Sequence, residues 1–518
     1  MPVRPRSFLV VALLSGALLV PAGGSNIAAA EEGTHSPNMS HVTTLAYGKP
    51  RPSAMENGGT DIEFASLKVD KRDANDKRIC KPQRDDPDRC RRNKKGNIIY
   101  QKEFREFALA GSYDNGLQIV DITTPTASRI VGHYDCAIRQ GDVQVFARGK
   151  RTYATYTQDD PYNGDPPHDT SSDCYREAGA LGLYKDGETN PAGTFIVDIT
   201  NPRDPVTASF FSEPRGSHNQ TVAPGGNFVY NSNSDLGTKN PQIEVWSIED
   251  FSNPRPVFTL NTQSGLSSHD ITFSEDGTRA YSAAVTHTLV LDTTDLAQPK
   301  IIGRIIDPAI NIHHQSDPIT MDGQTFLIIT DELAGAAGNA VCPGGGLHVY
   351  DITGPLERNP RKVGFWNSPG LRPAADNITC TSHVLRLYPE QKLMTIAWYE
   401  AGVRVVDISG LTGVSVGFNE EVGNVGMGMR EIGYHYFENS DTWSAKTNRI
   451  EADGSFYLYG NDLARGLDIY RFDGTAERSA NPGRWMTPEE ALAQARAGGV
   501  QTDVQTGPYC LYRGMRVA

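Results

Sequence analysis

A short strand pattern that recurs seven times is the sequence feature that most constrains the fold. It runs Gly-Leu-x-Ile-Val-Asp-Ile in its clearest copies, and the sixth positions are Asp121, Asp198, Ser247, Asp292, Asp351, Asp407 and Arg471. Consecutive copies lie 45 to 77 residues apart. Each copy is rich in β-branched residues and is flanked by turn residues, which is typical of a β-strand.

A second pattern precedes four of the copies and predicts a β-hairpin in each. It starts with a histidine, forms a short strand, and passes through a tight turn into a second strand. The four histidines are His218, His269, His314 and His383, with the adjacent His313 as an alternative to His314. With a fourth strand such as residues 205–211, each unit supplies a four-stranded sheet. Seven such units predict an all-β fold, a seven-bladed β-propeller, and the alternative is two separate β domains.

Composition and charge narrow the range of partners. The chain of 518 residues contains 51 Gly and 32 Pro, which suits a fold with many tight turns. Its net charge of −13 gives no general attraction to nucleic acid or to anionic lipid. We therefore expect no nucleic-acid partner, and a small molecule, a glycan or a protein remains open as the partner.

The N-terminus has the pattern of a cleaved secretory signal peptide. Arg4 and Arg6 precede an apolar run over residues 8–20, and an Ala-x-Ala sequence ends at Ala30. A basic start, a short apolar core and small residues at the cleavage site are typical of export signals. The run is shorter than the ~20 residues that a membrane span needs. We expect a secreted or periplasmic protein with no membrane span.

The remaining chain divides into three predicted segments. Residues 31–97 form a polar, partly disordered N-terminal segment, in which the charged stretch 68–97 is expected to be a solvated insertion. The propeller spans residues 98–480. Residues 481–518 form a short C-terminal helix, capped at Thr487, and a tail.

Seven cysteines in an exported chain are disulfide candidates before they are metal ligands. We pair Cys80 with Cys90, Cys136 with Cys174, and Cys342 with Cys380, which leaves Cys510. No two cysteines have Cys-x-x-Cys spacing, which disfavours a zinc ribbon or a thioredoxin-type site.

The repeated strand resembles the LVIVD repeat of secreted bacterial and archaeal propeller proteins. The resemblance covers residues 100–475. The segments Trp-Tyr-Glu-Ala-Gly at 398–402 and Gly-Asn-Asp-Leu-Ala-Arg-Gly-Leu-Asp at 460–468 look like blade-end loops of actinobacterial and proteobacterial members. The resemblance implies a propeller and export, and it implies no single activity.

The repeated histidines predict a site at one rim of the ring. The first strand of a propeller blade lies innermost, so the beginnings of these strands should meet near the axis. Second strands end at the same rim and add candidate catalytic carboxylates and candidate ligand-binding side chains. The catalytic candidates are Asp331, Glu332 and Glu400, and the ligand-rim candidates are Asp114, Asp142, Trp398, Trp443 and Asp462.

Three interpretations of this rim remain open. The leading one is a secreted propeller that binds a ligand or partner at a His/carboxylate rim. The alternative is a metal-dependent enzyme, such as an oxidase or a lyase, in which the four imidazoles hold Cu or Zn. In the structural interpretation, each histidine only ties down its own blade by hydrogen bonds. Imidazoles within about 5 Å of one another would favour the metal, because each metal–nitrogen bond is ~2.1 Å long.

Overall fold

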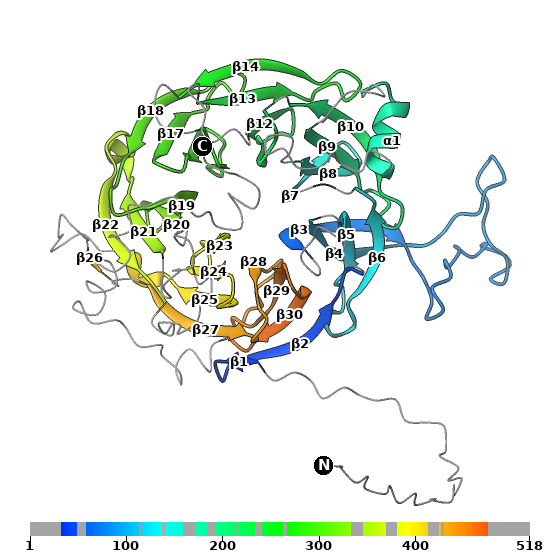
Figure 1. The fold of residues 1–518 in the computed structure, drawn as a ribbon. Coiled ribbons are helices and arrows are strands. Elements are labelled where there is room, and N and C mark those ends of the chain that lie inside the picture. Colours follow the sequence, from blue (N-terminus) through cyan, green and yellow to red (C-terminus); the bar gives the residue numbers. More distant parts are fainter. Residues whose placement is uncertain are drawn as a thin grey trace, which may run out of the picture. The chain divides into compact units, whose positions relative to one another are not determined.

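The seven repeats are the third strands of seven antiparallel sheets arranged around a central axis (Figure 1). The structure, a computed structural model, describes residues 33–48, 58–113, 115–136, 138, 140–158, 172–183, 192–213, 215–233, 241–262, 267–332, 345–368, 381–412, 424–425 and 429–474. The predicted seven-bladed β-propeller is confirmed. The expected signal peptide and C-terminal helix lie outside the described residues.

Each blade has four main strands, which lie side by side in order from the central axis outward. The innermost strands are β3 (Gly59–Asp70), β7 (Gln140–Arg148), β11 (Asn219–Val222), β15 (Asp270–Phe273), β19 (His313–Met321), β23 (Leu385–Tyr388) and β28 (Thr442–Lys446). The second strands are β4 (Lys102–Ser112), β8 (Arg151–Gln158), β12 (Phe228–Ser232), β16 (Arg279–Ala283), β20 (Gln324–Asp331), β24 (Leu393–Ala397) and β29 (Phe456–Asp462). The third strands, which carry the repeat, are β5 (Leu117–Asp121), β9 (Gly193–Asp198), β13 (Gln242–Ser247), β17 (Thr288–Asp292), β21 (Gly346–Asp351), β25 (Val403–Asp407) and β30 (Gly466–Phe472).

The outer strands complete the sheets. They are β6 (Arg129–Tyr134), β10 (Val206–Ser212), β14 (Arg255–Asn261), β18 (Lys300–Ile305), β22 (Arg361–Trp366), β27 (Arg430–Tyr436) and β2 (Met39–Leu45). Two short strands extend two of the sheets, β26 (Asn424–Val425) beside β22 and β1 (Thr34–His35) beside β27. The described helical segments are α1 (Asp173–Ala180), η1 (Pro125–Ala127), η2 (Gly354–Arg358) and η3 (Ser409–Leu411).

The repeated aspartate ends each strand by capping the following turn. In five blades one carboxylate oxygen accepts a hydrogen bond from the backbone N–H two residues later, at 2.9–3.2 Å. The same carboxylates form ion pairs with arginines on neighbouring strands, such as Asp351 with Arg361 at 2.9 Å and Asp407 with Arg430 at 3.1 Å. The aspartate of the repeat therefore has a local structural role, because this turn type favours Asp at its first position.

The glycine before the repeat is required by the backbone. Gly116 and Gly402 have φ values of 72° and 73°, in the left-handed region that L side chains rarely adopt. A Cβ at Gly116 would lie 2.3 Å from the carbonyl oxygen of Tyr134, and a Cβ at Gly402 would lie 2.2 Å from that of His435. The outer strand passes too close for any side chain at these two positions.

The N-terminal segment closes the ring. Strand β2 pairs with β30, so the last blade combines three strands from the end of the propeller sequence with one from its beginning. Strand β3, also from the segment expected at 31–97, is the innermost strand of the first blade. The propeller thus draws strands from residues before 98, and β2 and β3 are ordered strands in a stretch for which we expected partial disorder. A polar strand at the outer edge of a blade buries little, which explains why its pattern is weak in the sequence.

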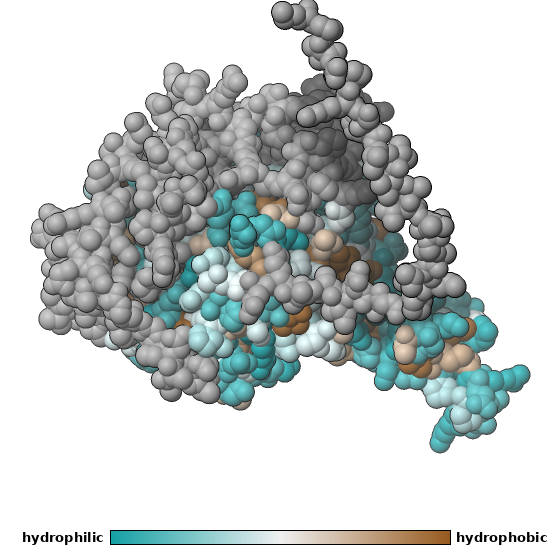
Figure 2. Space-filling model, turned by 60° about the horizontal axis from the view of Figure 1, so that its bottom comes forward, coloured by the Kyte–Doolittle hydropathy of each residue, from teal (hydrophilic) through white to brown (hydrophobic). Residues whose placement is uncertain are grey.

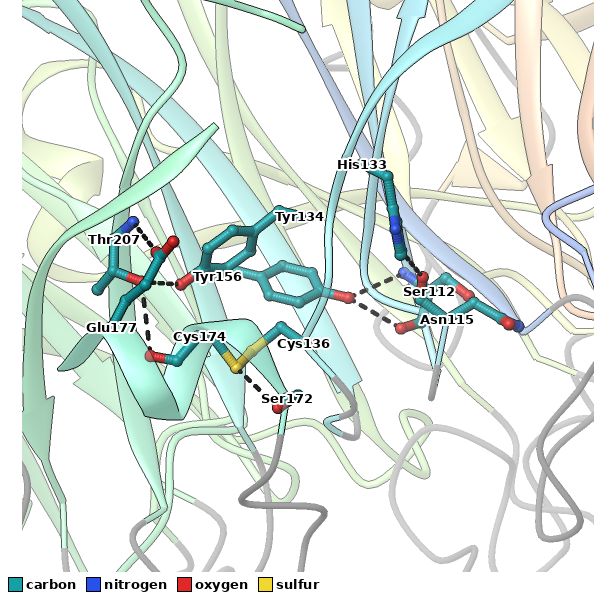
Figure 3. The surroundings of a disulfide bond; sticks show 10 residues. All are labelled: Ser112, Asn115, His133, Tyr134, Cys136, Tyr156, Ser172, Cys174, Glu177 and Thr207. Carbon is teal, nitrogen blue, oxygen red and sulfur yellow. Dashed lines mark hydrogen bonds between the residues drawn. A yellow bond between two sulfur atoms is a disulfide. The ribbon is translucent and has the colours of Figure 1, made fainter. Parts of the chain in front are cut away.

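Two of the expected disulfides are confirmed. Cys80 is bonded to Cys90, and Cys136 to Cys174. Figure 3 shows the second bond, which joins the end of β6 to α1. There Glu177 of α1 accepts a hydrogen bond from the backbone N–H of Thr207, which holds the helix against β10. Cys342, Cys380 and Cys510 lie outside the described residues.

Within the described ranges, no helix is both long and apolar enough to span a membrane.

Candidate metal centre

Four imidazoles form a continuous row at the beginnings of neighbouring inner strands. The ring centroids of His218 and His269 are 4.4 Å apart, those of His269 and His314 are 4.4 Å apart, and those of His314 and His383 are 4.3 Å apart. All four side chains are buried. The row runs through four consecutive blades, because each of these inner strands begins at the same rim.

Hydrogen bonds to the backbone fix the orientation of two of these rings. Nδ1 of His269 donates to the carbonyl oxygen of His314 at 2.9 Å, and Nδ1 of His383 donates to that of Trp443 at 2.5 Å. A carbonyl can only accept, so in the neutral ring Nδ1 carries the proton and Nε2 keeps its lone pair. A backbone carbonyl that fixes the tautomer in this way is the usual support of a metal-binding imidazole.

Glu332 lies between the last two imidazoles of the row. Its Oε2 is 3.6 Å from Nε2 of His314, and its Oε1 is 3.8 Å from Nε2 of His383. The three ligand atoms of this triad lie within 4.8 Å of one another. Two ligands of a tetrahedral ion with ~2.1 Å bonds are about 3.4 Å apart. The spacing of the triad therefore suits a first-row metal ion after a small adjustment of the side chains.

Burial favours the uncharged form of each side chain in the triad. Desolvation raises the pKa of Glu332 to about 8, although its hydrogen bond with Tyr399 lowers it. Desolvation also lowers the pKa of His383 to about 3 and that of His314 well below its usual range. Neutral imidazoles are the forms that bind metals. A divalent cation would stabilise the ionised carboxylate that burial now disfavours.

Tyr399 supports the triad, although its side chain is not among the site residues expected from the sequence. Its hydroxyl donates to Oε1 of Glu332 at 2.6 Å, and its ring lies 4.5 Å from that of His383. Its backbone has a φ of 45°, which is strained for a residue with a side chain. Strain of this kind persists where the surrounding structure holds a functional residue in place. In the sequence, the unusual Trp-Tyr-Glu-Ala-Gly turn at residues 398–402 is the feature that could have pointed to Tyr399.

Two other carboxylates at the ends of second strands, Asp331 and Asp462, form hydrogen bonds within their own blades. Asp331 accepts hydrogen bonds from the backbone N–H groups of Asn311 and Ile312, and its negative charge contributes to the raised pKa of Glu332. Asp462 caps the start of β28 by accepting from the backbone of Asp441 and the hydroxyl of Thr442. Both carboxylates organise loops of their own blades.

Of the two tryptophans expected at the rim, one lies at the site and the other lies in the hydrophobic core. Trp443 belongs to the site, with its ring 4.7 Å from that of His383. Trp398 lies in the hydrophobic core against Trp366. Glu400 is a partly exposed turn residue after Tyr399. Asp114 lies outside the described residues.

Gln140, rather than Asp142, stands beside the histidine row in the second blade. Its Nε2 lies 3.4 Å from Nε2 of His218 and donates to Asn219 at 3.1 Å. Asp142 lies farther along β7, where it accepts a hydrogen bond from the backbone N–H of Gln220. The adjacent His313 also lies apart from the row, because its Nδ1 is hydrogen-bonded to the hydroxyl of Thr288.

A central channel of about 400 Å³ leads to the triad. Its wall includes His314 and His383 at one end and side chains of all seven inner strands. Most of the charges on the wall are carboxylates, and Lys446 and Arg386 are the cations among its lining residues. Two of the three triad side chains, those of His314 and His383, thus border the channel.

Asp142 makes the stability of the ring depend on pH. Desolvation, followed by repulsion from Asp61, raises its pKa well above the usual range. A carboxyl with a raised pKa binds its proton more tightly in the folded state, so stability is lost as the pH rises above about 4. We expect Asp142→Asn to be more stable than the wild type at pH 8, by on the order of 1–2 kcal/mol. At pH 5 the advantage should be smaller.

Urea unfolding of both proteins at pH 5 and pH 8 measures this difference. The exposed Asp473→Asn is the control, and we expect no pH-dependent gain from it. An Asp142→Asn variant whose gain does not grow with pH would contradict the raised pKa.

Comparisons with known proteins assign no family to this chain. No family model matches the sequence, and no curated protein matches it. Similar solved structures include a protein from Lactobacillus plantarum, with 12% identity over 70% of this chain and 95% of that chain and a TM-score of 0.44. Another is the periplasmic gluconolactonase of Pseudomonas aeruginosa, with 10% identity over 71% of this chain and 96% of that chain and a TM-score of 0.42. At this level the likeness carries no argument about activity.

Proposed function

We propose that this protein is an exported, metal-dependent propeller enzyme whose ion is held by His314, Glu332 and His383. Next to the triad, Nε2 of His218 and Nε2 of His269 lie 2.8 Å apart and share a hydrogen bond, so these two imidazoles support the row without being ligands in this proposal. Nitrogen donors together with one carboxylate suit Zn or Cu. The substrate is a small polar molecule that reaches the ion through the central channel.

The observation that carries this proposal is the buried carboxylate of Glu332. It is fully buried, and among the described residues no Lys or Arg forms an ion pair with it. No hydrogen bond reaches its Oε2 or Nε2 of His383 within the described part of the chain. A fully buried carboxyl oxygen without a hydrogen-bond partner is unusual, and a bound metal ion would supply that partner. The two imidazoles facing the carboxylate make a metal the simplest partner.

The number of ligands favours a catalytic ion over a structural one. Structural zinc sites are closed by four protein ligands, whereas catalytic sites have three and keep a position for water or substrate. The triad supplies three ligands, and His314 and His383 also line the channel. A bound ion would act as a Lewis acid towards a ligand in the channel. Binding without turnover, at the same rim, is the function left if no reaction is found.

A titration of the chelator-treated protein with Zn²⁺ or Cu²⁺ tests the proposal. We expect one site per chain by calorimetry and a higher melting temperature, because a ligand that binds only the folded state stabilises it. At a free metal concentration of 100 times Kd, the gain is about 2.7 kcal/mol. A protein that binds neither ion and melts at the same temperature with and without chelator would refute a metal-dependent function.

Export is part of the proposal. The signal-peptide pattern at residues 1–30 supports it, and two disulfides are consistent with an extracellular or periplasmic protein. Sequencing the N-terminus of the protein recovered from outside the cytoplasm tests it, and we expect a start directly after Ala30.

Tyr399→Phe should weaken metal binding without removing a ligand. The change deletes the hydroxyl that orients Glu332 and stabilises its ionised form. Loss of such a supporting hydrogen bond typically lowers metal affinity about 10- to 100-fold. Competition with a chromogenic chelator measures the affinity, and Tyr350→Phe, whose hydroxyl binds Asp307, is the matched control. Equal affinities in the two variants would contradict the supporting role.

A further inference from the structure

A basic arm projects from an otherwise acidic ring. Residues 71–101, here named the basic arm, connect β3 to β4 and carry eleven Lys and Arg against five Asp. This local charge of +6 in a chain of −13 leaves −19 for the remainder. The arm is held in shape by the Cys80–Cys90 bond and by four isolated β-bridges. It leaves the right side of the ring in Figure 1, and Figure 2 shows there a largely hydrophilic projection.

A groove of about 540 Å³ lies at the base of the arm, between the first and second blades. Eight of its twenty lining residues are Lys or Arg, and five are Asp or Glu. Val206, at its edge, is 40% exposed, and Ile130 on the adjacent β6 is 36% exposed. The groove thus combines a surplus of positive charge with exposed apolar side chains, and it is separate from the histidine row.

One carboxylate of the arm already occupies a cationic position in this groove. Oδ1 of Asp76 is 2.7 Å from Nη2 of Arg203 and 3.5 Å from Nη2 of Arg129, and its Oδ2 is 3.4 Å from Nη1 of Arg72. These guanidinium groups come from three separate segments of the chain. Desolvation, followed by the positive charge of Arg72, lowers the pKa of Arg203, although Asp76 raises it. Three guanidinium groups thus converge on this one carboxylate.

We propose that the groove and the basic arm bind a short acidic segment of a partner protein. Its carboxylates would take the place of Asp76 on Arg203 and Arg129, and its apolar side chains would cover Val206 and Ile130. The arm adds exposed cations that form no ion pair within the described part of the chain, among them Lys81, Arg84 and Arg91. Pairs of Arg with carboxylate are strong because they are charge-assisted and directional.

The negative charge of the chain outside the basic arm favours a short partner over a long one. A nucleic acid or an anionic membrane extends beyond the groove and meets a surface with a net charge of −19, which repels it. A short acidic peptide stays within the arm and the groove. Base stacking is also disfavoured, because Tyr100 at the end of the arm is covered by the guanidinium of Arg78, 4.1 Å from its ring centroid.

Fluorescence anisotropy with a labelled twelve-residue oligo-glutamate peptide containing two leucines tests the proposal on the full chain. We expect saturable binding at low salt that weakens as the salt concentration rises. Arg129→Ala combined with Arg203→Ala should weaken binding about tenfold. Asp76→Asn should strengthen it several-fold, because it removes the internal competitor. The exposed Arg449→Ala, which removes one positive charge in a different blade, should change nothing.

The Asp76 variant keeps the test decisive even if the arginine variant folds poorly. No binding of the peptide, or an Asp76→Asn variant that binds it less tightly, would overturn the proposal. Tighter binding of a DNA oligonucleotide, a sulfated polysaccharide or anionic vesicles by the same arginines would also overturn it, in favour of that ligand. Concentration-dependent dimers that Arg203→Ala abolishes would assign the groove to a second copy of this chain instead.

Discussion

The double variant His314→Ala, His383→Ala is expected to be purified without its metal ion. Each substitution removes one of the three proposed ligands, and the Glu332 carboxylate that remains would not hold an ion alone. We expect about one ion per chain in the wild type and less than about a tenth of that in the variant. Inductively coupled plasma mass spectrometry of protein dialysed against metal-free buffer measures both values.

Two controls separate ligand loss from general damage. His133→Ala removes an exposed imidazole of the first blade and should keep the full metal content. His383→Gln, in which the replacement can fill most of the same space, should lose the ion while the circular dichroism spectrum stays that of the wild type. A double variant that retains the wild-type metal content would show that the ion, if present, is bound elsewhere.

Lys446→Ala should be the most destabilising single substitution in the channel wall. The buried ammonium donates to Asp61 at 2.7 Å and to Glu63 at 2.9 Å, and it joins the last blade to the first. Arg386 still pairs with Glu63 in the variant, whereas Asp61 keeps no cation in contact among the described residues. Breaking a buried pair in this way typically costs about 3–5 kcal/mol.

Urea unfolding at pH 7 measures this cost, and its pH dependence identifies the cause. Burial raises the pKa of Asp61, and Lys446 lowers it, so removal of Lys446 lets Asp61 bind a proton at higher pH. The penalty should therefore shrink as the pH falls towards 4. Lys102→Ala, which breaks a half-exposed pair with Asp70, should cost less than about 1 kcal/mol. A Lys446→Ala variant as stable as this control would contradict a structural role for the pair.

The ring could be predicted from the sequence because each blade repeats the same local requirements. The glycine at Gly116 and Gly402 satisfies a left-handed backbone, and Asp351 and Asp407 cap the turns that follow their strands. Such short-range rules leave the glycine in five of the seven copies and the aspartate in five of the seven. The equivalence of the four histidines followed from the same alignment, and so did their position at one rim.

The remaining features depend on contacts between distant parts of the chain. Strand β2 has no repeat signature, because its role is fixed by pairing with β30 more than 400 residues later. The side chain of Tyr399 matters because the turn at Gly402 directs it towards Glu332, which lies on another blade. Gln140 lies beside His218 through a left-handed φ of 70° at the start of β7. The positions of strand β2, Tyr399 and Gln140 therefore cannot be predicted from the neighbouring sequence alone.

The position of the ion is the most direct test of the central claim, that the row of histidines in the propeller is a metal centre. Crystals of the metal-loaded protein, measured at the absorption edge of Zn or Cu, give an anomalous difference map that locates it. We expect one peak within about 2.3 Å of Nε2 of His314, Nε2 of His383 and a carboxylate oxygen of Glu332. A map with no peak there, from crystals grown with excess metal, would contradict the account.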